Sequence, residues 1–326
     1  ECLIAGCGFS GSVSSTGSQA GGIVGRVVDR CEVDACETEG TVSADGDEAG
    51  GVVGRAETHV AILSCSSSAP VSANSSVGGL VGVAMFDIDV ADSYATGSVT
   101  AAGGNAGGLA GYIRAYTGSG PRQVELRRCF ATGDVTAETD NAGGLCGRAW
   151  EGVVKQCFGT GMVTGRNNIG GLGGEMQCSV SDSYATGAVA GNRQVGGLNG
   201  YGGTLIRCYS AGTVEGSAPV GGIVGRYGRM TSCIWNPDDS GVDTANGADG
   251  KGSAYGKTTA EMKSAETYTT WIGEQEEIPW DFTSIWAIAE GETYPYLLDM
   301  PGPGSETYTV TFDLEPHGNL HEGTLV

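Results

Sequence analysis

The sequence predicts an all-β fold, a right-handed parallel β-helix (β-solenoid) with a mixed C-terminal cap. Three observations lead to it: glycine makes up 59 of 326 residues, a glycine motif recurs at nearly constant spacing, and a block of small residues accompanies each copy. Hydrophobic residues still amount to 40%, which excludes a disordered chain. Only nine prolines are present, and glycine does not recur at every third residue, which excludes collagen.

The glycine motif is Gly-Gly-x-x-Gly. Its successive copies are 25 to 29 residues apart, with one longer step of 36 residues. A unit of this size cannot bury its own apolar face, so we expect about eight to nine units of ~28 residues to stack as coils roughly 4.8 Å apart. A β-propeller is the alternative, but its blades need about 40–50 residues. The eight copies begin at Gly21, Gly50, Gly78, Gly107, Gly143, Gly170, Gly196 and Gly221.

A second block accompanies each glycine motif, with clear copies at Ser93-Tyr-Ala-Thr-Gly-Ser-Val99 and Cys129-Phe-Ala-Thr-Gly-Asp-Val135. Its residues alternate between a small or apolar set and a variable set, which is the pattern of a strand with one inward face. Small inward side chains suit a narrow core in which stacked coils approach closely. We expect the glycines to serve turns that need positive φ and close backbone approach.

These blocks, with Gly78-Gly-Leu-Val-Gly82, resemble the GLUG motif, a repeat of bacterial surface adhesins that also occurs beside the catalytic part of some immunoglobulin A peptidases. The resemblance covers about residues 1–235, although the copies at Cys36 and Cys65 lack the aromatic residue. It implies a non-enzymatic extracellular module of a bacterial cell-surface or secreted protein, an adhesin or spacer that binds host protein or glycan. An accessory domain of a secreted peptidase is an alternative that the resemblance leaves open.

The chain leaves the repeat after residue 235. Residues 236–256 have the composition of a loop, and Thr258-Thr-Ala-Glu261 fits a capping box that begins a helix over 259–271. Large apolar residues then concentrate up to residue 300, so we interpret 236–300 as a cap over the last coil. Residues 301–306 form a linker by composition, and 307–326 resemble the start of a further small β-repeat module. Both ends suggest a fragment of a larger modular protein.

The eleven cysteines follow the repeat. Seven occupy one column, in which Ser93 and Ser183 fill the other places, and Cys2 and Cys31 begin a second column that Cys178 joins. We interpret the first column as a row of buried small side chains. Disulfides between adjacent coils, such as Cys2–Cys31 and Cys7–Cys36, are the alternative, because paired strands bring Cα atoms into bridging range. The seven members of the first column are Cys7, Cys36, Cys65, Cys129, Cys157, Cys208 and Cys233.

Two sets of residues are candidate binding sites. The first is the aromatic column that follows the cysteine column; outward rings would form a stripe for sugar rings or a protein partner, whereas a covering loop would bury them. The second is the long insertion over 112–128, which is rich in aromatic and basic residues, although its arginines could instead pair with nearby acids. The candidates are Tyr94, Phe130, Phe158, Tyr184 and Tyr209 in the column, and Tyr112, Arg114, Tyr116, Arg122, Arg127 and Arg128 in the insertion.

No catalytic motif stands out. The sequence has three histidines and no His-Glu-x-x-His, so zinc-peptidase chemistry is not encoded in it. A carbohydrate-active β-helix enzyme is the main alternative function, because β-helices often carry clustered carboxylates. The acids available for such a cluster include Asp45, Asp47, Glu48, Asp238 and Asp239.

Charge and composition limit the other partners. With 17 basic and 38 acidic residues, the chain has a net charge of −21, which disfavours nucleic acid and anionic lipid. No apolar run approaches the ~18 residues of a membrane helix, and we expect a monomer without a cofactor. The one cation site that the sequence offers is a loop that could bind Ca²⁺ through Asp238, Asp239, Asp243 and Asp249.

Overall fold

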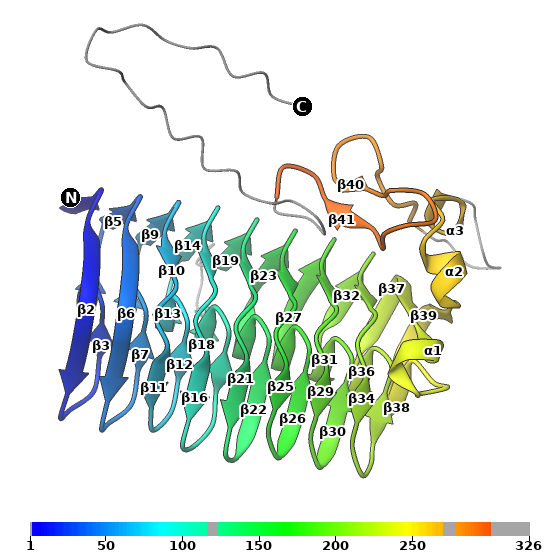
Figure 1. Cartoon of the computed structure of the whole chain (residues 1–326), viewed down its shortest axis with the longest axis horizontal. Coiled ribbons are helices and arrows are strands. Elements are labelled where there is room, and N and C mark those ends of the chain that lie inside the picture. Colours follow the sequence, from blue (N-terminus) through cyan, green and yellow to red (C-terminus); the bar gives the residue numbers. More distant parts are fainter. Residues whose placement is uncertain (1, 116–122, 270–277, 301–326) are drawn as a thin grey trace, which may run out of the picture.

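The computed structural model describes residues 2–115, 123–269 and 278–300. They form a rod of stacked parallel coils, along which the chain advances from one end to the other (Figure 1). A sheet of 31 strands wraps around most of the rod, and a second sheet of eight strands adds one strand per coil. The predicted parallel β-solenoid is confirmed. Among the described residues, no helix is both long and apolar enough to cross a membrane.

Each coil has four faces, which we number in chain order from the glycine motif. Face 1 follows the motif, and its strands are β4 (Val24–Val28), β8 (Val53–Glu57), β13 (Val81–Met85), β18 (Ala110–Arg114), β23 (Cys146–Lys155), β27 (Gly173–Ser181), β31 (Asn199–Tyr201), β36 (Val224–Arg226) and β38 (Asn246–Ala248). Face 2 comprises β1 (Cys2–Ala5), β5 (Cys31–Asp34), β9 (Val60–Leu63), β14 (Ile88–Ala91), β19 (Val124–Arg127), the second halves of β23 and β27, β32 (Thr204–Ile206), β37 (Arg229–Trp235) and β39 (Lys251–Gly256).

Face 3 carries the Cys/Ser blocks, and face 4 leads back into the glycine motif. Face 3 comprises β2 (Gly8–Ser15), β6 (Glu37–Ala44), β10 (Ser66–Ser67), β11 (Val71–Ala73), β15 (Tyr94–Ala95), β16 (Val99–Ala101), β20 (Phe130–Ala131), β21 (Val135–Ala137), β24 (Phe158–Gly159), β25 (Val163–Thr164), β28 (Tyr184–Ala185), β29 (Val189–Ala190), β33 (Tyr209–Ser210) and β34 (Val214–Glu215). Face 4 comprises β3 (Ala20–Gly21), β7 (Ala49–Gly50), β12 (Val77–Gly78), β17 (Ala106–Gly107), β22 (Asp140–Gly143), β26 (Asn167–Gly170), β30 (Arg193–Gly196) and β35 (Val220–Gly221).

The register between coils aligns the repeat position by position. On face 4, Gly107 pairs with Gly78 in the coil before and with Gly143 in the coil after. On face 3, Val99 and Val135 pair in the same way. Equivalent side chains therefore form columns along the rod, as the sequence repeat predicts.

The motif glycines are required for close approach, and not for positive φ. None of the glycines in the eight motifs, all of them described, has a positive φ. A Cβ on Gly79 would lie less than 3.0 Å from the carbonyl oxygen of Gly108 and from the Cβ of Ala95 across the coil. Gly108 faces Ala131 in the same way. Faces 3 and 4 thus meet at a waist, which explains the small third residue of the Cys/Ser blocks from Cys36 to Cys208.

Most of the described residues with positive φ are not glycine, although glycines outside the motif, such as Gly202 and Gly203, also have positive φ. The prediction that the turns need glycine for positive φ is therefore right only in part. One such position lies directly before the Cys/Ser column, where φ is between 48° and 53° from Ala35 onwards. Inter-coil side-chain contacts hold several of these corners, as shown below for Arg128 and Arg207. The residues at this position are Ala35, Ser64, Asp92, Arg128, Gln156, Asp182, Arg207 and Ser232.

The waist divides the interior into two hydrophobic clusters. The larger contains most of the cysteine column together with leucines and isoleucines of faces 1 and 2 and of the glycine motifs. The smaller contains the valines that end the Cys/Ser blocks and the apolar residues before each glycine pair. Seven of the eleven cysteines are less than 2% exposed, which agrees with the interpretation of buried small side chains.

The cap begins later than the sequence indicates. Residues 236–256 are not a loop, because β38 and β39 continue the parallel ladder beside β36 and β37 after the short helix α1 (Pro237–Ser240). The capping box of Thr258 and Glu261 is present. The helix predicted over 259–271 is instead two short helices, α2 (Thr259–Met262) and α3 (Glu266–Thr269). The last strands, β40 (Trp286–Ala287) and β41 (Tyr296–Leu297), form an antiparallel pair above the upper edge of the coils in Figure 1.

Candidate ligand-binding face

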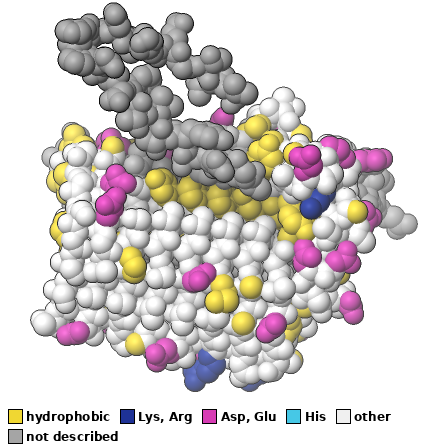
Figure 2. Space-filling model, in the orientation of Figure 1, with side chains coloured by type: hydrophobic (Ala, Val, Ile, Leu, Met, Phe, Trp, Pro, Cys, Tyr) yellow, Lys and Arg dark blue, Asp and Glu magenta, His cyan; other side chains and the backbone are white. Residues whose placement is uncertain are grey.

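The aromatic column of face 3 forms as predicted. Its rings stack at centroid separations of 4.8–4.9 Å, the spacing between coils. Figure 2 shows hydrophobic side chains in a row across the coils. Four of the five rings, however, are buried, and only Tyr94 is exposed, at 38%. The buried rings are Phe130, Phe158, Tyr184 and Tyr209.

The cap covers the C-terminal end of this column. Trp286 packs against both Tyr184 and Tyr209, and Trp280 against Tyr209. The Tyr209 hydroxyl donates a hydrogen bond of 2.6 Å to the Pro295 carbonyl, and burial raises its pKa well above the usual value. The rings of Tyr184 and Tyr209 therefore hold the cap, and the four buried members of the column do not form an open stripe for sugar rings.

The insertion of the fourth coil leaves the ladder intact. On either side of it, β18 pairs with β13 and β23, and β19 pairs with β14 and β23. Arg127 donates two hydrogen bonds to the Asp89 carboxylate, and Arg128 donates two to Asp92. The bonds from Arg128 lower the pKa of Asp92. Both arginines thus connect neighbouring coils. Tyr116 and Arg122, the other two candidates nearby, lie outside the described residues.

The other two residues of the insertion, Tyr112 and Arg114, lie on face 1 and point outward. The next coil places Arg148 beside Tyr112 and Trp150 beside Arg114. The Arg148 guanidinium lies 5.0 Å from the Trp150 ring centroid and 6.0 Å from that of Tyr112. Such a cation–π arrangement keeps large rings at the surface in a fixed orientation.

The same face continues through the next coils. Trp150 donates a hydrogen bond of 3.4 Å to Glu175, which also pairs with Arg148 at 3.0 Å. Glu175 pairs in register with Tyr201, and Tyr201 with Arg226. We call this set the aromatic–arginine face; it consists of Tyr112, Arg114, Arg148, Trp150, Glu175, Gln177, Tyr201, Arg226 and Tyr227.

A shallow cleft of about 470 Å³ lies at the C-terminal end of this face. It forms where coils six to eight turn from face 1 to face 2. Its floor is Gly202 and Gly203, and its lining includes Gln177, Ser179, Tyr201, Thr204, Tyr227 and Arg229.

Sequence reasoning found Tyr112 and Arg114 but missed the rest of the aromatic–arginine face. The signal that was missed is the position in the repeat. The residue directly after the last glycine of the motif is outward in each coil of this face. These residues are Tyr112, Arg148, Glu175, Tyr201 and Arg226. Aligning the eight motifs by that glycine would have placed them in one outward column. The variety of residue types at this position hid the column.

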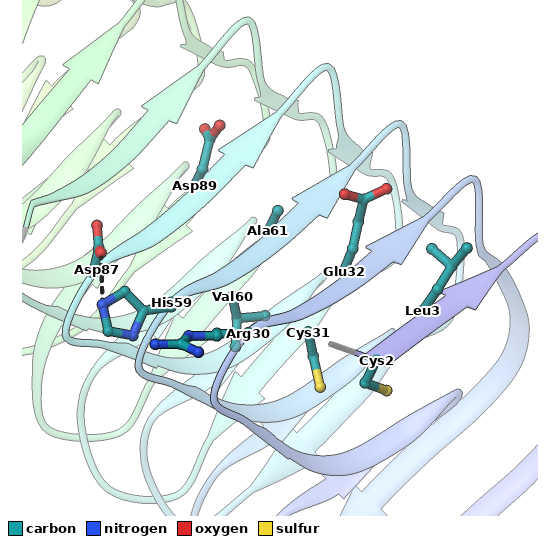
Figure 3. Close-up of a pocket in the computed structure, with 10 residues that line it drawn as sticks. All are labelled: Cys2, Leu3, Arg30, Cys31, Glu32, His59, Val60, Ala61, Asp87 and Asp89. Atoms are coloured by element: carbon teal, nitrogen blue, oxygen red, sulfur yellow. Dashed lines mark ion pairs between the residues drawn. The ribbon is translucent and has the colours of Figure 1, made fainter.

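A second cleft, of about 500 Å³, lies at the N-terminal end of the rod (Figure 3). Cys2 and Cys31 pair in register there and lie side by side in the figure. His59 lies between Asp29, at 3.6 Å from Nδ1, and Asp87, at 3.4 Å from Nε2. All eleven cysteines of the chain are free thiols in the structure, so the disulfides considered above are not formed in it.

The different burial of the thiols predicts that they react with an alkylating reagent at different rates. We expect iodoacetamide at pH 8 to label exposed Cys2 first and to leave Cys65 and Cys178 unmodified in the folded protein. Burial raises the pKa of Cys65 and of Cys178 to about 12, so each stays protonated as well as shielded. Mass spectrometry of tryptic peptides, before and after unfolding in urea, measures this order. Labelling of Cys178 as fast as Cys2 without urea would contradict the burial.

Most of the acidic residues considered for catalysis or calcium make contacts within the fold. Asp238 accepts a hydrogen bond from the Thr259 amide, and Asp239 accepts one from the Tyr294 hydroxyl. Asp249 pairs with Arg226 at 3.0 Å. Within the described ranges, no three His, Cys, Asp or Glu side chains are grouped as metal ligands. The structure therefore does not gather Asp238, Asp239, Asp243 and Asp249 into one site.

Fold and surface together define the class of the protein: a parallel β-solenoid of glycine-rich coils with an exposed aromatic–arginine face. A family model described as the GLUG motif matches residues 73–100. This stretch runs from the end of β11 into β16 and so covers one complete coil, and the neighbouring coils pair with it in register. The chain therefore carries a GLUG motif. Searches among curated proteins and among solved structures found no match.

Proposed function

We propose that the chain is a non-enzymatic, extracellular module of a bacterial cell-surface or secreted protein. It acts as a monomeric adhesin or spacer and contacts host protein or glycan through the aromatic–arginine face. The observation that carries the proposal is the exposed Trp150 ring, held beside Arg148 on a strand that pairs with both neighbouring coils. Aromatic residues and arginine are the side chains most enriched where proteins bind large partners.

The rod geometry supports this role. A solenoid presents one continuous surface over many coils. Because each coil contacts only its neighbours, the outward side chains of this surface can be substituted without altering the core. The GLUG match is consistent with such a module, because the motif is a repeat unit. The strongly acidic chain favours protein or glycan over nucleic acid as the ligand.

Binding to arrayed host glycans and to mucin tests the proposal. We expect Trp150→Ala to weaken binding by about tenfold or more, as truncation of a central aromatic contact does. Tyr94→Ala is the matched control, because Tyr94 is exposed to the same degree (38% against 39%) but lies on face 3. Circular dichroism establishes that both variants fold. The proposal fails if the wild type binds neither probe, or if Trp150→Ala binds as the wild type does.

A further inference from the structure

We propose that the cleft at Gly202–Gly203 binds the carboxylate-bearing sugar of an acidic glycan, a hexuronic or sialic acid. This inference rests on the proposed function, because the cleft continues the aromatic–arginine face. Its volume of about 470 Å³ lies within the range of small-ligand sites, and it is open enough to admit one residue of a longer chain.

The backbone builds the hollow. Gly202 and Gly203 have φ values of 76° and 98°, and a Cβ on either would lie less than 3.0 Å from the Met176 carbonyl oxygen or the Asn199 side-chain amide nitrogen. The turn of the seventh coil therefore consists of two residues without side chains between Tyr201 and Thr204. Larger residues of the adjacent coils surround this turn: Gln177 belongs to the sixth coil, and Tyr227 and Arg229 belong to the eighth, where Arg229 pairs in register with Thr204. The result is a recess walled by side chains from three successive coils.

Unpaired positive charge marks the recess. Arg229 is exposed, and its guanidinium has no ion-pair or hydrogen-bond partner among the described residues. Lys251 follows it in register on β39 and is likewise exposed and unpaired within that part of the chain. In contrast, Arg148 and Arg226 are neutralised by Glu175 and Asp249. A guanidinium offers parallel N–H donors that match a carboxylate, so this end of the face is complementary to a carboxylated ligand.

The remaining walls suit a sugar ring. Tyr227 is 45% exposed, and Tyr201 meets it edge to face at a centroid distance of 5.4 Å. Arg226 lies 4.5 Å from the Tyr227 centroid and donates a hydrogen bond to its hydroxyl, which fixes the ring. Hydroxyls of Ser179 and Thr204 and the amide of Gln177 line the same recess. An aromatic ring with hydroxyl and amide partners binds the apolar face and the hydroxyls of a sugar.

The alternatives fit less well. A polyphosphate or nucleic acid would approach a chain of net charge −21 at a recess where the described residues offer the two adjacent cations Arg229 and Lys251. An acidic peptide would satisfy Arg229 but would not need the Tyr227 ring. We therefore argue for the glycan and treat the peptide as an outcome of the test.

Matched ligand pairs test the charge of the sugar. Isothermal titration with oligogalacturonate and its methyl ester, and with sialyllactose and lactose, compares acidic and neutral forms of the same glycan and distinguishes hexuronic from sialic acid. We expect one acidic form to bind at least tenfold more tightly than its neutral partner. Oligoglutamate serves as the peptide probe, and we expect it to bind more weakly than the acidic glycan.

Matched variants test the residues. We expect R229Q to abolish the preference for the acidic form and Y227A to weaken both forms. R193Q is the control, because Arg193 is an exposed arginine on face 4, and we expect it to bind as the wild type does. Equal affinity for acidic and neutral forms, an unaltered preference in R229Q, or tighter binding of oligoglutamate overturns the inference. If Trp150-dependent binding to another glycan or to mucin then persists, only the cleft assignment is lost; absence of all binding removes the proposed function as well.

Discussion

Gly107→Ala is expected to lower the free energy of unfolding by about 3 kcal/mol, at the upper end of the usual cost of overpacking. A Cβ at this position would lie less than 3.0 Å from the Ala110 carbonyl oxygen and the Gly147 amide nitrogen. Both obstacles are backbone atoms within the coil ladder, so no side-chain rotation relieves the clash. The cause is steric, because φ at Gly107 is not positive.

Urea unfolding followed by circular dichroism measures the effect. Gly8→Ala is the control, because nothing lies within 4 Å of its added Cβ and its φ is not positive either. We expect its unfolding midpoint to stay close to that of the wild type. Equal midpoints for the two variants would show that the motif glycines are not selected by close backbone approach.

Arg207→Ala is expected to lower the free energy of unfolding by about 3–5 kcal/mol, because it leaves the buried carboxylate of Asp182 without its partner. Asp182 is 1% exposed at its side chain and accepts two hydrogen bonds from Arg207, of 2.6 and 2.7 Å. Without the guanidinium, the carboxylate remains inside the corner between two coils. The same bonds raise the pKa of Arg207, which favours the charged guanidinium.

Arg128→Ala supplies the comparison, because the same corner position makes the same two-bond contact to the preceding coil. Here Arg128 and Asp92 are 40% and 44% exposed, and solvent screening reduces their contribution to about 1 kcal/mol or less. Thermal and urea unfolding of the two variants compares them directly. If Arg128→Ala lowered the free energy of unfolding as much as Arg207→Ala does, burial would not determine how much these ion pairs stabilise the fold.

The repeat itself could be predicted because it is local. Spacing alone placed the coils, the Cys/Ser column and the aromatic column, and the register confirms all three. The small residues of the glycine motif and of the Cys/Ser block already indicated that the two segments approach closely, as Gly79 and Ala95 do. What spacing could not reveal was which positions take positive φ, because residues as different as Asp92, Arg128 and Gln156 share that conformation.

The burial of the aromatic column depends on contacts that no local pattern encodes. Tyr209 meets Pro295 and Trp286, which are more than 75 residues away in sequence. The sequence identified the cap residues and the column separately, but nothing in it linked the two. The aromatic–arginine face was predicted only in part, because its residues share a position in the repeat but not a residue type.

The ladder on either side of the long insertion has a practical consequence. Because β18 and β19 keep their pairing with both neighbouring coils, the connection between them can vary in length and composition at little energetic expense. Doubling a flexible loop costs only about 0.6 kcal/mol of closure entropy. This connection therefore tolerates replacement by other peptide sequences, in evolution or by design. A binding peptide inserted between β18 and β19 would follow Tyr112 and Arg114 in the chain and leave the coils unchanged.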